Sequence, residues 1–157
     1  MSQSPIDPIL GRVPSGIFIL TAASEGQSTG MLASWVMQAG FEPPTLTVAV
    51  KLGRYVGEWL TAGQPFVLNF VREHDKLLLK HFVRGFEPGE PAFEGLATEL
   101  TSTGIPLLAT ALGYLECKPL RHLDSGDHRI FLAQVVDGHL AHDEPPMVHV
   151  RKTGKHY

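Results

Sequence analysis

The stretch 112–136, LGYLECKPLRHLDSGDHRIFLAQVV, contains two apolar segments on either side of a turn signal. Leu112–Leu120 and Ile130–Val136 each have the length and apolar character of a strand. Ser125-Gly126-Asp127 between them combines residues that favour tight turns. The pattern predicts an antiparallel hairpin built from two long strands.

More strands are expected upstream of this hairpin. Ile17–Thr21 (IFILT), Thr45–Val50 (TLTVAV) and Phe66–Val71 (FVLNFV) are compact apolar runs typical of buried strands. Leu96–Thr103 favours a further short strand. These segments alternate with loop signals, so a curled antiparallel arrangement is expected.

The region between the first two upstream strands is less clear. Glu25–Thr29 is polar and contains Gly26, which indicates a hairpin loop. Gly30–Phe41 has some helical spacing but lies between two strand-like runs. We interpret it as an extended strand followed by an irregular loop, with Pro43-Pro44 excluding a helix beyond it.

Helices are predicted at a few places only. Arg54–Ala62 has apolar residues at helical spacing and is followed by Gly63, which suits a helix end. Glu73–Val83 reads as an amphipathic helix, and Ile6–Val13 as a short helix or turn. The chain is therefore predicted to be mainly β with a few helices, in a single domain over residues 1–157. Many short strands favour a barrel over a doubly wound sheet, and no G-x-G-x-x-G follows a strand.

Composition narrows the classes of function. The hydrophobic fraction is 43% and the formal net charge is −3, which argues against a nucleic-acid binder held by bulk charge. No apolar run reaches the length of about 18 residues needed to span a bilayer, and the first ten residues do not resemble a secretory leader. We expect a cytoplasmic protein with no membrane partner. The single cysteine, Cys117, is expected to be a buried apolar residue.

Motifs for metal or hydrolytic chemistry are weak. The eight histidines are at positions 74, 81, 122, 128, 139, 142, 149 and 156, and they form no H-E-x-x-H pattern. No metal site is predicted. Ser15 and Ser34 lack the G-x-S-x-G context of a nucleophile elbow, and no carboxylate pair suggests glycoside hydrolysis.

The order of several local phrases is more informative. RVPSGIFILTA at 12–22 precedes GMLASWVMQAGFEPP at 30–44 and TLTVAVK at 45–51, and these are followed by FVLNFV at 66–71, LLKHFVRGF at 78–86 and SGDHRIFLAQVVDG at 125–138. This series resembles the flavin reductase-like family over nearly the whole chain. It is most similar to the flavin reductase module of cyanobacterial diflavin flavodiiron proteins. The resemblance implies an FMN-binding split β-barrel, a homodimer with tightly bound FMN at the interface, and NADH or NADPH as electron donor.

The resemblance also implies a site. The family places its flavin against the loop that corresponds here to 33–40, and small residues there would let a flat ring approach the backbone. The cofactor-binding residues predicted from that loop are Ala33, Ser34, Trp35, Gln38, Ala39 and Gly40. Relatives often have small hydroxyl residues where this chain has Gln38 and Gly40.

The remaining site residues come from three other places. Lys51 and Arg54 lie between a strand end and a helix start, where two cations suit a phosphate; two solvated charges are the alternative. Phe82 is expected at the flavin edge or simply in the core. His128 is the predicted catalytic residue, placed near flavin and nicotinamide, with an exposed turn histidine as the alternative. The basic segment Arg151–Tyr157 resembles the tail that closes such domains.

Three functions are compatible with these observations. The first is an NAD(P)H-dependent flavin reductase that passes electrons to oxygen, free flavin or a di-iron partner domain. The second is a non-catalytic FMN module that relays electrons without its own NAD(P)H site. The third is a ligand-binding barrel that has lost the flavin, an alternative that Gly40 leaves open.

Overall fold

A curled antiparallel sheet dominates the structure, a computed structural model that describes residues 4–157. Residues 1–3 of the predicted domain lie outside the described residues. The helices are α1 (Asp7–Leu10), α2 (Tyr55–Thr61) and α3 (Lys76–Phe82). The strands are β1 (Ser15–Gly16), β2 (Phe18–Ser24), β3 (Gln27–Ala33), β4 (Val36–Gly40), β5 (Thr45–Lys51), β6 (Phe66–Phe70), β7 (Thr98–Leu100), β8 (Pro106–Leu108), β9 (Gly113–Ser125), β10 (His128–Leu140) and β11 (Val148–His149).

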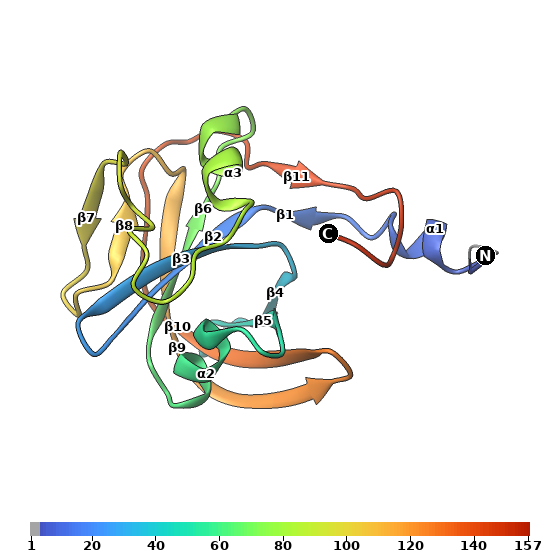
Figure 1. Ribbon diagram of the computed structural model, residues 1–157, viewed down its shortest axis with the longest axis horizontal. Helices are drawn as coiled ribbons and strands as arrows, with labels where there is room; N and C mark the ends of the chain where they lie inside the picture. The colour runs from blue at the N-terminus through green and yellow to red at the C-terminus, as the bar shows by residue number, and fades with distance from the viewer. Residues whose placement is uncertain (1–3) are drawn as a thin grey trace.

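The seven-stranded sheet has the order β3-β2-β6-β9-β10-β5-β4. Its two outermost strands, β3 and β4, are consecutive in the chain and are joined by Ser34 and Trp35 alone. The sheet must therefore curl until its edges meet, although β3 and β4 are not hydrogen-bonded to each other (Figure 1). This is the geometry of a split barrel, and the mainly β fold class is confirmed.

The predicted hairpin forms the longest part of the sheet. β9 and β10 pair along their length, and both extend beyond the predicted strands into exposed polar residues. Gly126 has φ of 64°, a left-handed conformation that glycine adopts without strain, at the turn between them. The turn was placed correctly, whereas the strand ends were not.

Two predictions about the region before β5 need correction. The predicted loop Glu25–Thr29 is a turn at Glu25 and Gly26 only, because residues from Gln27 onward belong to β3. The irregular loop expected after the first extended segment is instead a strand, β4, which pairs with β5. Its residues are largely exposed, so no alternation of apolar residues marks it.

Two apolar clusters lie on opposite faces of β2. Phe18 and Leu20 face the barrel interior together with Phe66 and Phe131. Ile19 faces a second cluster beneath α3, which contains the buried side chains of Leu78 and Phe82. Burial on both faces explains why this strand is a continuous apolar run. Cys117 is fully buried as expected, and burial raises the pKa of its thiol to about 12.

The termini form an arm beside the barrel. Figure 1 shows α1 and β1 running outward next to the returning segment that contains β11. The backbone N–H of Arg151 donates to the Gly11 carbonyl over 2.8 Å, which joins the two segments. No helix within residues 4–157 has the length and apolar character needed to cross a membrane.

Candidate functional site

A cavity of about 350 Å³ opens where the two edges of the curled sheet meet. Its wall includes the end of β3, the link at Ser34 and Trp35, the end of β5 and one side of α3. The lining residues are Ile17, Met31, Leu32, Ala33, Ser34, Trp35, Ala49, Lys51, Arg54, Leu79, Phe82, Val83, Gly85, Met147, Val148, His149 and Tyr157. The volume lies within the range of about 300–1,000 Å³ typical of small-molecule sites.

The link between β3 and β4 is held in place by the neighbouring strand. The N–H of Ala49 on β5 donates to the Trp35 carbonyl over 3.0 Å. Ala33 is buried, and Ser34 beside it has a small side chain. Ala33, Ser34 and Trp35 all line the cavity, and their role in cofactor binding stays a prediction.

Two cations stand at the rim of this otherwise apolar cavity. Lys51 ends β5 and Arg54 precedes α2, and both are exposed. Neither forms an ion pair with an aspartate or glutamate of residues 4–157, and no aspartate or glutamate side chain in that range lines the cavity. The site therefore suits a ligand with an apolar flat part and an anionic end.

Phe82 contributes to both the core and the cavity. Asp75 caps the start of α3: its carboxylate accepts a hydrogen bond from the N–H of Leu78 and stabilises the first turn of the helix. Phe82 is buried in the cluster beneath α3, yet its ring reaches the cavity wall. The two interpretations of Phe82 are therefore compatible.

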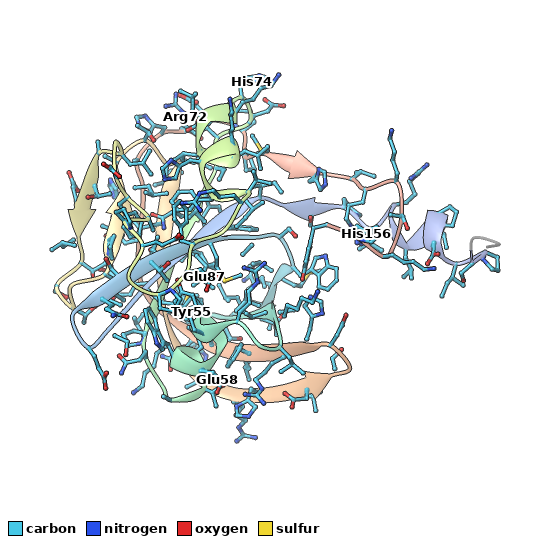
Figure 2. All side chains as sticks on the ribbon, viewed as in Figure 1. Tyr55, Glu58, Arg72, His74, Glu87 and His156 are labelled. Carbon is cyan, nitrogen blue, oxygen red and sulfur yellow. The ribbon has the colours of Figure 1, made fainter. Side chains whose placement is uncertain are left out.

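A smaller polar pocket of about 250 Å³ adjoins the cavity and shares Met31, Arg54 and Gly85 with it. Tyr55 and Glu87 both line it, and both are labelled in Figure 2. The Tyr55 hydroxyl lies 2.8 Å from the Phe86 carbonyl, which ties α2 to the loop after α3.

The second half of the predicted flavin-binding loop, residues 38–40, lies outside the cavity wall. Gln38, Ala39 and Gly40 are on β4 and do not line the cavity. A Cβ atom at Gly40 would stand 2.6 Å from the Thr45 hydroxyl, so a larger residue there would require the Thr45 side chain to shift. A cofactor role for these three residues stays a prediction.

His128 is buried behind the cavity wall. It begins β10 opposite Lys51, is 7% exposed and does not line the cavity. Its ring centroid lies 4.6 Å from that of Trp35, and its Nδ1 lies 2.7 Å from an oxygen of Asp127. The hydrogen bond from His128 holds the pKa of Asp127 below its usual range. The alternative of an exposed turn histidine is wrong.

Tyr157 is the residue at this site that sequence reasoning missed. Its hydroxyl is hydrogen-bonded to Nε2 of His128, and its ring lines the cavity. An aromatic residue closing a basic segment was the available signal. Its position, however, depends on contacts with residues near the other end of the chain.

The fold and the cavity define a class of protein: a split β-barrel with a largely apolar ligand site where the two edges of its sheet meet. The model of the flavin reductase like domain family matches residues 10–156, and the chain belongs to this family. The predicted resemblance is confirmed, and it places the chain among flavoprotein oxidoreductases.

Three relatives illustrate the similarity. The chain is 40% identical to diflavin flavoprotein A 1 of Synechocystis sp. over 157 residues, which cover 99% of this chain and 27% of that protein. The NADH:FAD oxidoreductase of Streptomyces globisporus superposes with a TM-score of 0.84 at 26% identity, covering 91% of this chain and 85% of that one. Flavin reductase HpaC, complexed with NADP⁺, gives 0.79 at 25% identity and 92% coverage of both chains. The chain spans about a quarter of the length of the diflavin flavoproteins it matches.

Proposed function

We propose that the protein is an NAD(P)H-dependent flavin reductase that holds FMN in the cavity at the sheet junction. The supporting observation is the combination of small residues at Ala33 and Ser34, a largely apolar wall, and two cations that form no ion pair within residues 4–157, in a chain of this family. A bound flavin would supply the redox chemistry by accepting a hydride and passing electrons onward. The acceptor in this proposal is oxygen, free flavin or a di-iron partner domain.

In this proposal the residues of the chain bind the flavin and orient it. The backbone at Ala33, Ser34 and Trp35 would offer donors and acceptors to the polar edge of a flat ring, and Phe82 would bound its apolar edge. Lys51 and Arg54 would hold the phosphate, because both line the cavity, both are exposed, and neither is in an ion pair with an aspartate or glutamate of residues 4–157. The apolar wall would exclude water from the ring.

A homodimer is part of this proposal. Val83 and Val148 line the cavity, yet they are 64% and 62% exposed, and Leu77 on α3 is 80% exposed. Apolar residues at the rim of a site favour coverage by a second chain. We expect an interface of about 1,600 Å². Sedimentation of FMN-loaded protein as a monomer at micromolar concentration would contradict it.

Anaerobic titration of FMN-loaded protein with NADH and NADPH tests the function. We expect the flavin absorbance band to bleach with one equivalent of the preferred donor. Retention of colour with both donors would favour the electron-relay module, and a protein that never takes up FMN would favour the barrel that has lost its flavin. The diflavin flavoprotein relatives, which are much longer than this chain, make a fused partner domain the first acceptor to test.

A further inference from the structure

Tyr157 stands at the mouth of the cavity with its ring against Trp35. The two ring centroids are 5.1 Å apart at an interplanar angle of 48°. The ring lines the cavity while the residue as a whole remains 58% exposed. A ligand that enters from solvent therefore meets Tyr157 before it meets the buried wall at Ala33 and Phe82.

The hydroxyl of Tyr157 is held by a chain of hydrogen bonds. Nδ1 of His128 lies 2.7 Å from a carboxylate oxygen of Asp127, and in the tautomer that donates this hydrogen bond from Nδ1–H, Nε2 is left as an acceptor. The Tyr157 hydroxyl then donates to Nε2. His128 is buried against the rings of Tyr157 and Trp35 and does not line the cavity itself, so its hydrogen bond to the Tyr157 hydroxyl is the polar link between Asp127, His128 and the cavity.

The segment that contains Tyr157 is also held by contacts of Arg151 and Lys155. The guanidinium of Arg151 donates to the carbonyls of His156 over 3.0 Å and Leu10 over 3.3 Å, and it lies 5.3 Å from the Trp35 ring centroid. Lys155 lies 3.3 Å from the buried carboxylate of Asp7 on α1. Figure 2 shows His156 between the barrel and α1. The position of Tyr157 is thus set by contacts on both sides.

We propose that Tyr157 is the side chain that contacts the nicotinamide of the electron donor, and that His128 and Asp127 position it. This inference rests on the proposed function and changes the predicted role of His128 from a direct contact to a positioning residue. A flat, half-exposed ring at the entrance suits a second flat ring that arrives after the cofactor, since aromatic pairs at such distances attract each other. The hydride transfer itself needs no proton from the tyrosine.

Nucleotide binding without turnover is the test. Calorimetry would measure the Kd of NAD⁺ and NADP⁺ for oxidised, FMN-loaded protein in the parent, Tyr157→Ala, Tyr157→Phe and His128→Ala. Tyr114→Phe is the matched control, because Tyr114 lies on β9 and does not line the cavity. We expect Tyr157→Ala to weaken nucleotide binding tenfold or more while FMN affinity stays within about twofold, and His128→Ala to weaken nucleotide binding less.

Two further measurements separate a positioning role from a structural one. In Tyr157→Phe the imidazole ¹⁵N signals of His128 should shift even without flavin, whereas Tyr114→Phe should leave them unchanged. The double variant Tyr157→Ala/His128→Ala should bind nucleotide no more weakly than Tyr157→Ala alone, since both act through one contact.

The outcomes are distinguishable. If the parent binds nucleotide and is reduced by it, but Tyr157→Ala binds equally well, the inference fails and the proposed function stands. Loss of FMN in Tyr157→Ala also overturns the inference, because it makes Tyr157 a cofactor contact. If the parent neither binds nor is reduced by either nucleotide, both fail.

Discussion

Removal of the two rim cations should weaken FMN binding but leave riboflavin binding almost unchanged. Riboflavin has the same ring and lacks the phosphate, so it reports the ring contacts alone. A hydrogen bond to a charged group contributes about 1.5–3 kcal/mol. Lys51 and Arg54 are exposed, so the lower value applies to each of them. The variant Lys51→Ala/Arg54→Ala should therefore lose about 3 kcal/mol, or roughly a hundredfold in Kd for FMN.

Quenching of flavin fluorescence would measure both affinities in the parent, the two single variants and the double variant. Lys118→Ala is a suitable control, because Lys118 is an exposed cation on β9 outside the cavity. Thermal unfolding would show that each variant is folded. Equal losses for FMN and riboflavin would refute the reasoning, and so would an unchanged FMN affinity, which would place the phosphate elsewhere.

Three further predictions concern the structure that supports the site. Phe131→Ala should cost about 3–5 kcal/mol of unfolding free energy in urea titrations, since this ring is buried in the barrel; a loss below 1 kcal/mol would argue against the packing described. Gly30→Ala would place a Cβ 2.7 Å from the Phe82 ring, so we expect about 1–3 kcal/mol of destabilisation together with weaker flavin binding, and an unaffected flavin Kd would separate Phe82 from the site. The hydrogen bond from Arg129 to Asp124 (2.6 Å) lowers the pKa of that carboxyl in the folded state, so its stabilising effect is present above the ordinary aspartate pKa of about 3.9 and is lost as pH falls through the folded value. The Tm of the parent should accordingly exceed that of Asp124→Asn at pH 6 and converge with it in acid, and a pH-independent difference would contradict this.

The sequence predicts those strands of this protein whose residues are buried. β2, β5 and β6 were located because their apolar residues are packed against the barrel core or α3. β4 was mistaken for a loop because its exposed residues are held by pairing with β5, which leaves no apolar pattern. The polar ends of β9 and β10 were missed for the same reason.

The candidate site was predicted only in part because it is assembled by contacts between distant segments. Lys51 and Arg54 were proposed from their position at a strand end together with the resemblance, and the resemblance supplied the segment that begins at Ala33; the structure places Lys51, Arg54 and Ala33 on one cavity. Tyr157 was not assigned, since its place against Trp35 depends on the pairing of its segment with residues near α1. No local pattern contains that information.

Because the two-residue link between β3 and β4 lines the cavity, ligand binding and the thermal stability of the fold are coupled. A molecule bound in the cavity would contact β3, the link at Ser34 and Trp35, and β5 together, so it would bridge two strands that are not hydrogen-bonded to each other. By mass action, a ligand at a hundred times its Kd adds about 2.7 kcal/mol to the folded state. The difference in Tm of each variant with and without flavin therefore reports whether the cavity is occupied, without any redox assay.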